Sequence, residues 1–283
     1  MPIKINIGSR LAGGLALLFA VSLLISGCGG SHGGKTESHL PVLDELIRAR
    51  RDYDKGHYSD AVLSLAQFTD RHPGSRFMDE ALFKLGKSHQ YIAEYLLATD
   101  SFRRILDDYP QSEWLEEATY ELGRSAYLGS KGPDYDQEAT YDAISTFRLY
   151  LRQYPEGNFV KDVEELLFIC EDRLVRKAYI SGDTYLKVHR MEPARFYFDK
   201  GIAIRSDVPA AADCLLGLAR SYKIEKKPIK ALEAFERLQI WLEGEGANLL
   251  EAEKHDRLLE SIANEMNSLT VGEEIFPPDS MTE

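Results

Sequence analysis

The sequence predicts an all-α solenoid of about five helix hairpins followed by a C-terminal capping helix. The first observation is a motif: in five places an alanine stands four residues before a large apolar residue, as Ala98 stands before Phe102. The second is a period, because 37 residues separate Ala61 from Ala98 and also separate Ala194 from Ala231. The third is a proline twelve residues after the alanine in three units, at Pro73, Pro110 and Pro155. Hairpins repeated at this period stack, because none can bury its apolar face alone.

Each unit is expected to contain two helices. An alanine–aromatic pair with a closing proline is typical of tetratricopeptide repeats, in which two antiparallel helices form one unit. The first three expected pairs span residues 42–55 with 58–71, 77–93 with 95–108, and 114–128 with 137–153. Ala98 and Ala143 are 45 rather than 37 residues apart, so eight extra residues lie in the turn of the third unit. A longer loop at one turn often marks a contact surface.

The later units continue the pattern as far as a final helix. A long helix is expected at 160–188, where apolar residues recur at helical spacing: Leu166, Leu167, Cys170, Leu174 and Ala178. Gly182 and Ala219 each stand twelve residues before a repeat alanine, as Gly86 does in the second unit. Gly244 and Gly246 then interrupt the pattern. Beyond them one apolar helix face is predicted to cover the open end of the solenoid, formed by Leu258, Leu259, Ile262, Met266 and Leu269.

These elements divide the chain into five segments. We expect a signal peptide at 1–27, a flexible tether at 28–40, a five-repeat domain at 41–243, a C-terminal helix at 244–269 and a disordered tail at 270–283. The tether is rich in Gly and Ser, which favours flexibility. The tail combines Pro277 and Pro278 with acidic residues, a composition that cannot bury a core of its own.

Residues 1–27 have the organisation of an export signal. Two basic residues precede an apolar run at 11–25, and small residues at 26–27 precede Cys28. A membrane span would need about 20 apolar residues, so this run favours a cleaved signal over a short transmembrane anchor. Ile-Ser-Gly-Cys at 25–28 resembles a bacterial lipobox. That resemblance implies cleavage before Cys28 and lipid on its sulfur and amine, and Gly29 in place of Asp implies the periplasmic face of the outer membrane.

Composition and residue spacing argue against several functions. A formal net charge of −12 disfavours nucleic acid as a partner, because phosphate contacts supply most of that affinity. Residues 29–33 match G-x-S-x-G but lie in the tether, without the strand and helix that a nucleophile elbow needs. The seven His residues show no metal-ligand spacing, so we expect no enzyme, no metal and no cofactor. Cys170 and Cys214 are expected to be buried free thiols, with a disulfide between them as the alternative.

Three cations recur at the repeat period. Arg50, Lys87 and Arg124 are each 37 residues apart, and we call them the cation ladder. First helices of stacked hairpins line the concave groove of such a solenoid, so one repeat position becomes a row along it. Five further residues on the same helix faces complete a predicted groove for clients or peptides: Tyr53, Phe83, Gln90, Tyr120 and Tyr127.

A groove of this composition suits an extended peptide with aromatic side chains and a free carboxylate. The guanidinium groups of Arg50 and Arg124 can each bind a carboxylate through two hydrogen bonds, and Lys87 would contribute a point charge. The alternative is that the cations only form ion pairs on a solvated helix face. The acidic partners would then be Glu80, Glu117 and Glu121.

From Ala49 to Ile240 the pattern resembles the BamD family of outer-membrane assembly lipoproteins. The resemblance rests on the lipobox cysteine, the five repeats, the insertion in the third repeat, and Tyr-Pro at 109–110 and 154–155. It also rests on Cys-Glu-Asp-Arg-Leu at 170–174, which is similar to the family's C-x-D-R-L-A stretch with Val175 in place of Ala.

The resemblance implies a non-catalytic scaffold of the β-barrel assembly machinery. It implies that repeats one to three bind unfolded outer-membrane protein clients through their C-terminal segments, which end in an aromatic residue and a carboxylate. It further implies that repeats three to five dock the periplasmic domains of a BamA-like barrel insertase. The alternative is a lipoprotein scaffold of pilus, secretion or envelope-polysaccharide machinery, because one fold supports many functions.

Overall fold

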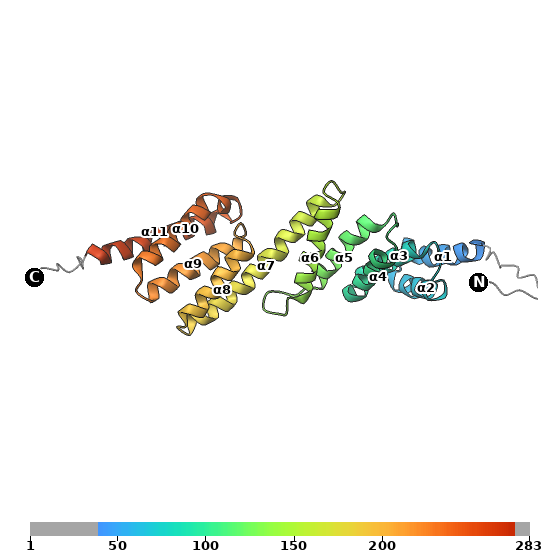
Figure 1. The fold of residues 1–283 in the computed structure, drawn as a ribbon, viewed down its shortest axis with the longest axis horizontal. Coiled ribbons are helices and arrows are strands. Elements are labelled where there is room, and N and C mark those ends of the chain that lie inside the picture. Colours follow the sequence, from blue (N-terminus) through green and yellow to red (C-terminus); the bar gives the residue numbers. More distant parts are fainter. Residues whose placement is uncertain (1–38, 275–283) are drawn as a thin grey trace, which may run out of the picture. The chain divides into compact units, whose positions relative to one another are not determined.

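The computed structural model describes residues 39–274, and the regular elements within that range are helices (Figure 1). They are α1 (His39–Asp54), α2 (Tyr58–Arg71), α3 (Met78–Tyr91), α4 (Tyr95–Asp108), α5 (Leu115–Gly129), α6 (Glu138–Gln153), α7 (Val160–Lys187), α8 (Met191–Ile204), α9 (Pro209–Ile224), α10 (Pro228–Glu243), the 3-10 helix η1 (Glu245–Asn248) and α11 (Ala252–Glu274). The predicted signal peptide, Cys28 and residues 275–283 lie outside the described residues.

The helices pair into hairpins that pack in chain order. Each of α3 to α10 contacts the helix before it, and α11 packs against α10 (Figure 1). Four buried apolar clusters hold the stack together, and most of them draw side chains from three or more helices. This arrangement confirms the predicted tetratricopeptide solenoid of five hairpins with a C-terminal helix.

Three predicted boundaries require correction. The predicted C-terminal helix at 244–269 is interrupted at its start, because the 3-10 helix η1 spans Glu245–Asn248 and α11 begins at Ala252. α1 begins at His39, so the last two residues of the predicted tether are helical. α11 continues to Glu274, five residues past Leu269, so residues 270–274 of the predicted disordered tail are helical. The disorder prediction depended on Pro277 and Pro278, and residues 270–274 contain no proline to end a helix.

A glycine opposite a phenylalanine sets how closely the two helices of a hairpin approach. A Cβ atom added at Gly123 would lie 2.6 Å from the ring of Phe147, which is fully buried. The same contact recurs in the second and fourth hairpins. At the equivalent positions of the first hairpin, Ala49 carries the methyl group that glycine lacks, and the smaller Leu65 replaces phenylalanine. In three of the five hairpins the aromatic ring therefore fills the space that a missing Cβ leaves, whereas Ala219 holds the equivalent position in the fifth.

Both cysteines of the described chain are buried and free, as predicted. Burial raises the pKa of the Cys170 thiol to about 11 and that of the Cys214 thiol to about 12. Reaction requires an accessible thiolate, so both groups are inert packing residues at neutral pH.

The turn inside four of the five hairpins has one backbone conformation. Equivalent residues adopt positive φ angles of 76°, 61°, 58° and 56°: Gly56, Ala93, His189 and Lys226. In the second hairpin, the N–H of Ala93 donates to the carbonyl oxygen of Gln90 (3.0 Å) and that of Glu94 to the carbonyl oxygen of His89 (2.8 Å). These two bonds close the helix end as in a Schellman motif. The third hairpin departs from the rule because the insertion replaces this turn.

We expect Ala93→Gly to raise the free energy of unfolding by about 1 kcal/mol, because glycine has no Cβ to strain at positive φ. Urea unfolding followed by circular dichroism measures the change. Ala98→Gly is the matched control: it lies inside α4 and is buried, so it should lower stability by about 1 kcal/mol or more. A loss of stability in Ala93→Gly would show that the turn does not depend on this φ angle.

Candidate functional site

The cation ladder lies on α1, α3 and α5, and each of its members is paired with a carboxylate. Arg50 Nη1 lies 3.0 Å from Glu80 Oε1, and Lys87 Nζ lies 2.5 Å from Glu121 Oε1. Arg124 Nη1 lies 3.3 Å from Glu121 Oε2. The side chains of Arg50 and Arg124 are 40% and 38% exposed, whereas that of Lys87 is 15% exposed. Only the two arginines therefore present charge to an incoming ligand.

Glu121 joins α3 to α5, and its side chain is only 5% exposed. Its Oε2 accepts a hydrogen bond from Gln90 Nε2 (2.8 Å), which also donates to Ser125 Oγ (2.7 Å). Gln90 Oε1 in turn accepts a hydrogen bond from Arg124 (3.4 Å). A buried carboxylate is tolerated when its charge and lone pairs are satisfied, as they are at this position.

This network corrects two expectations. Gln90 is buried with its amide bound inside the network, so it does not line an open groove. The ion pairs that the alternative names are present for Glu80 and Glu121, but Glu121 is buried rather than on a solvated face. Glu117 forms no ion pair among the described residues, and burial raises its pKa.

Phe83 and Tyr120 pack between repeats, which corrects the prediction that they line the groove. Phe83 is buried and stacks on Trp114, with 4.5 Å between ring centroids. Tyr120, one period later, stacks on Phe159 at 4.4 Å with 4° between the ring planes. Trp114 and Phe159 precede the first helix of the following repeat. Helical spacing placed these residues on the same side as the cations, but it could not tell a ligand-facing side from one that faces the next repeat.

Three tyrosines form an aromatic cluster where α1, α2 and α3 meet. Tyr58 stacks on Tyr91 with 4.0 Å between centroids, and Tyr53 lies 5.7 Å from Tyr58. Lys84 Nζ lies 4.6 Å from the centroid of the Tyr53 ring. Burial, with Tyr91 and Tyr58 adding to it, raises the pKa of Tyr53 to about 12. Tyr53 was predicted. Tyr58 was missed because it lies on the second helix of its hairpin. The exposed Tyr91 follows Lys87 by four residues on α3 and was missed because its repeat equivalents, Asp54 and Leu128, are not aromatic.

The insertion of the third repeat is an ordered loop held by α7. Arg173, within the 170–174 stretch, donates a hydrogen bond to Ser130 Oγ and lies 5.3 Å from the ring centroid of Tyr127. Lys177 Nζ donates to the carbonyl oxygen of Tyr135 (2.9 Å). Tyr135 itself is exposed. The loop therefore exposes the side chain of Tyr135 on a backbone that α7 holds in place.

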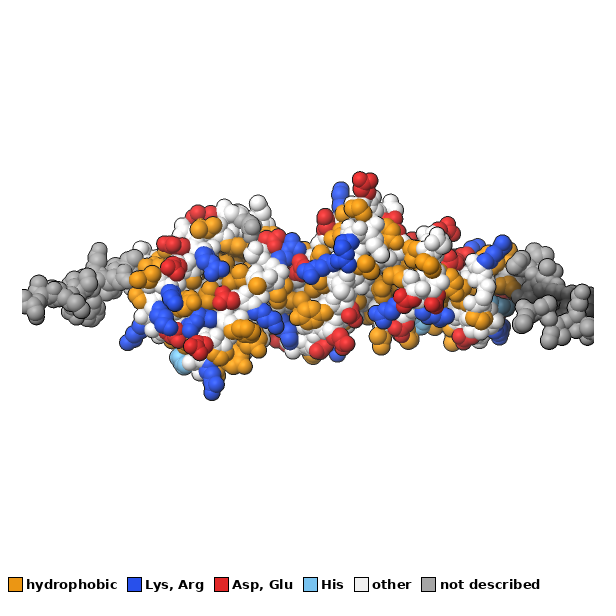
Figure 2. Space-filling view, viewed as in Figure 1, with side chains coloured by type: hydrophobic (Ala, Val, Ile, Leu, Met, Phe, Trp, Pro, Cys, Tyr) orange, Lys and Arg blue, Asp and Glu red, His pale blue; other side chains and the backbone are white. Residues whose placement is uncertain are grey.

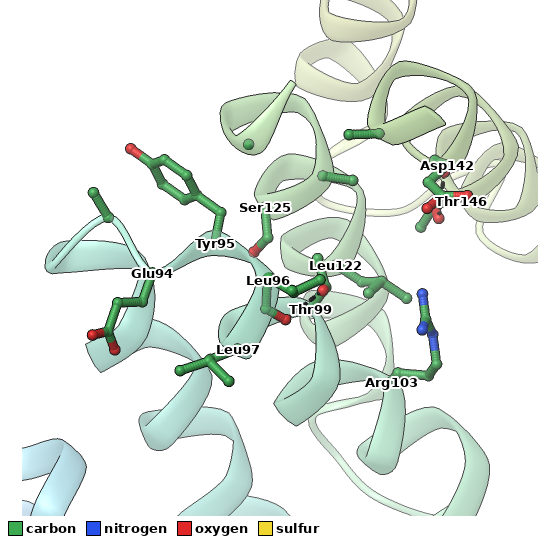
Figure 3. Close-up of a pocket in the computed structure, with 14 residues that line it drawn as sticks. Glu94, Tyr95, Leu96, Leu97, Thr99, Arg103, Leu122, Ser125, Asp142 and Thr146 are labelled. Atoms are coloured by element: carbon green, nitrogen blue, oxygen red, sulfur yellow. Dashed lines mark hydrogen bonds between the residues drawn. The ribbon is translucent and has the colours of Figure 1, made fainter. Parts of the chain in front are cut away.

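A cavity of about 550 Å³ lies between α4, α5 and α6 (Figure 3). Leu96 and Leu97 of α4 line one side of it, and Asp142 and Thr146 of α6 line the other (Figure 3). Leu96 is 77% exposed and Leu97 is 47% exposed, so the rim of the cavity offers two adjacent apolar side chains to a partner. Ser125 lines the cavity and also binds Gln90, so the cavity and the ladder network share one residue.

The cavity was missed although a signal for it exists in the sequence. One period before Leu96 and Leu97 stand Ser59 and Asp60, the polar residues expected at solvent-facing positions of a second helix. Comparison of the repeats position by position therefore reveals two apolar residues where the first repeat has none. The signal lies in the second helices, outside the first-helix register in which the cation ladder recurs.

These surfaces offer apolar side chains, tyrosines and partly exposed arginines. Among residues 39–274, no three or more His, Cys, Asp or Glu side chains are grouped so that they could hold a metal ion. In the same range, no helix is both long enough and apolar enough to cross a membrane.

Known proteins of one family are similar in sequence to this chain. A family profile described as outer membrane lipoprotein (YfiO) matches residues 46–202, more than half of the chain. The outer membrane protein assembly factor BamD of Haemophilus influenzae is 27% identical over 238 residues, 79% of this chain and 83% of the relative. BamD of Helicobacter pylori is 23% identical over 195 residues, 66% of this chain and 84% of the relative.

Solved structures with a similar course of the chain include tetratricopeptide proteins. One from Thermus thermophilus has a TM-score of 0.34 at 15% identity and covers 79% of this chain and 97% of its own. The TPR2AB domain of yeast Sti1 has a TM-score of 0.36 at 12% identity and covers 79% of this chain and 99% of its own.

Glu121→Gln should lower the free energy of unfolding by about 3 kcal/mol, because it leaves the mostly buried Lys87 without its counter-charge. Glu80→Gln is the matched control: its partner Arg50 is well exposed, so the loss should stay below about 1 kcal/mol. Chemical denaturation of both variants measures the difference. Removing both charges as Lys87→Met with Glu121→Leu should recover most of the loss. Equal effects of the two single variants would contradict a buried role for Glu121.

Proposed function

This chain belongs to the outer membrane lipoprotein family whose profile it matches, and we propose that it is a non-catalytic scaffold for assembling β-barrel proteins into the outer membrane. Two relatives of comparable length, both named outer membrane protein assembly factor BamD, support this role. The protein would work by binding, holding a client and an insertase on one stack of hairpins.

The lipid on Cys28 would hold the scaffold at the periplasmic face of the outer membrane. The lipobox at 25–28 supports this anchor, and the Gly- and Ser-rich residues that follow it suit a tether. Several acyl chains anchor a protein stably where a single chain binds only marginally.

Client binding by the first three repeats is carried by one observation: the open cavity with exposed Leu96 and Leu97 on its rim. Apolar or aromatic side chains of an unfolded client segment would enter the cavity. Arg124, which shares the hydrogen-bond partner Gln90 with the cavity-lining Ser125, would attract the client's terminal carboxylate. Arg50 and the tyrosines Tyr53 and Tyr127 would extend the surface along the stack.

Insertase docking is assigned to repeats three to five, with the ordered insertion as its first contact. An exposed Tyr135 on a loop anchored by Lys177 can bury apolar area without ordering a flexible segment first. Pre-ordering of this kind favours binding because less conformational entropy is lost.

A synthetic peptide that ends in an aromatic residue tests the client surface. Leu96→Ser with Leu97→Ser should weaken its binding about tenfold or more, because apolar area is no longer buried. Amidating the peptide's C-terminus should weaken binding to the unchanged protein about tenfold, and Arg124→Gln should abolish that difference. Fluorescence anisotropy measures the affinities.

Ile229→Ser with Ile240→Ser is the matched control for the leucine pair, because both isoleucines are exposed in the fifth hairpin. Their replacement should leave peptide affinity unchanged. Equal affinity for acid and amide peptides would remove the role of Arg124, and full binding by the leucine variant would remove the role of the cavity.

Co-purification in mild detergent tests the machinery. The unchanged protein should recover a β-barrel protein with periplasmic domains, and Tyr135→Ala should recover several-fold less of it because an exposed contact is lost. Leu63→Ala, at an exposed position on α2 outside repeats three to five, is the control and should recover the normal amount. Recovery of a pilus or secretion component instead would refute the assembly role.

A further inference from the structure

Positive charge is concentrated in two turns of the last two hairpins, although the formal net charge of the chain is −12. Residues 187–190 and 223–230 form the turns inside the fourth and fifth hairpins, and together they hold six Lys or Arg residues and a single Glu. We call these two turns the basic edge. Figure 2 shows several Lys and Arg side chains along the lower side of the C-terminal hairpins, beside apolar side chains and some Asp and Glu side chains.

The two turns are joined into one surface. Arg195 of α8 lies 2.7 Å from Glu225, the one acidic residue of the edge, and its guanidinium carbon lies 4.8 Å from the ring centroid of Tyr222. This contact brings the start of α8 against the end of α9. Glu225 is shared between Arg195 and Lys227, so one carboxylate is divided between two cations.

Three cations of the basic edge have no carboxylate partner within residues 39–274. Arg190, Lys226 and Lys230 form no ion pair there and are exposed. Lys223 differs, because it binds Glu265 of α11. The free cations are therefore available to an external anion.

Exposed aliphatic side chains lie among the free cations. Val188 is 62% exposed, and Ile229, next to Lys230, is 66% exposed. Ile224 is also exposed, at the end of α9. Lysines and arginines interspersed with exposed aliphatic residues match the interfacial region of a bilayer, where amines meet phosphates and apolar side chains enter the acyl boundary.

The fold does not require this composition. In the second hairpin, the residues equivalent to 223–230 are 90–97, which contain no Lys or Arg and one Glu. In the first hairpin, residues 53–60 contain one Lys and two Asp. All three turns adopt the same positive-φ conformation, so the charge serves something other than the turn.

We propose that the basic edge docks on the anionic phospholipid headgroups of the bilayer in which the chain is anchored. The inference rests on the proposed function, because the lipid on Cys28 would keep the chain next to a membrane. The local concentration of headgroups near the basic edge would then be high. A second contact would hold the C-terminal hairpins against the membrane. Each free cation near an anionic surface favours the contact about fivefold.

The test uses the full chain, purified from membranes and reconstituted into vesicles, with Ile229→Cys carrying an environment-sensitive fluorophore. Cys170 and Cys214 are buried, so labelling is confined to position 229 when Cys28 is acylated. Vesicles of phosphatidylethanolamine with phosphatidylglycerol are compared with vesicles of phosphatidylcholine, and brominated lipid serves as the quencher. Quenching of the label is expected in the anionic vesicles and should fall at high salt.

Replacing the three free cations together, as Arg190→Gln, Lys226→Gln and Lys230→Gln, should reduce the ratio of docked to undocked protein roughly a hundredfold. The matched control carries the same charge change at three exposed lysines elsewhere, Lys55, Lys161 and Lys200, and should quench like the parent. Flotation with vesicles reports the anchor separately from the label.

Protein that floats while its label stays in water in both vesicle types overturns the inference and leaves the anchor standing. That result is expected if the edge instead meets an acidic protein segment. Equal quenching in neutral vesicles overturns the charge contact. Failure to float, as Cys28→Ala should show, overturns the anchor in the unchanged protein and this inference with it.

Discussion

The packing of a phenylalanine ring against a glycine, which three of the five hairpins share, is the constraint on which the spacing of those hairpins depends. Phe147 fills this space in the third hairpin over Gly123. Phe198 does so twice, because Cβ atoms added at Gly182 and at Gly217 would each lie 2.5 Å from its ring. One ring thus sets the spacing within its own hairpin and against the next hairpin. Because these contacts are closely packed, each hairpin fixes the position of the next one. The relative positions of the exposed surfaces follow from this packing.

Residues 170–174 form a junction in which successive side chains hold different parts of the molecule. Cys170 and Leu174 enter a buried cluster with α5 and α6. Glu171 is buried between Arg148 of α6 (2.5 Å) and Arg205 after α8 (2.7 Å). Asp172 accepts a hydrogen bond from the N–H of Ala210 (2.9 Å) at the start of α9, and Arg173 holds the insertion. The stretch that carries the family resemblance is therefore a structural centre, and it positions the loop assigned to docking.

The two ends of the stack have different surface chemistry on one backbone. The second hairpin exposes Leu96 and Leu97 at the mouth of a cavity, whereas the equivalent turn of the fifth hairpin exposes Lys226, Lys227 and Lys230. Since the turn geometry is common to both, side chains at these positions are free to specify partners. A repeat architecture separates the two tasks: buried positions set the stacking, and the exposed positions of each unit set what it binds.

Periodicity by itself determined the fold class, the bounds of the first three helix pairs to within three residues, and the insertion, because buried packing positions recur at a fixed interval whatever residues lie on the surface. It also located Arg50, Lys87 and Arg124 on one helix side. Tertiary structure alone decided what that side faces: Phe83 packs against the next repeat, and Glu121 is buried between cations. Helical spacing reports direction around one helix, whereas exposure depends on how closely the next hairpin packs. The cavity of α4 to α6 and the basic edge arise from residues of separate helices and turns, so only the packed chain brings them together.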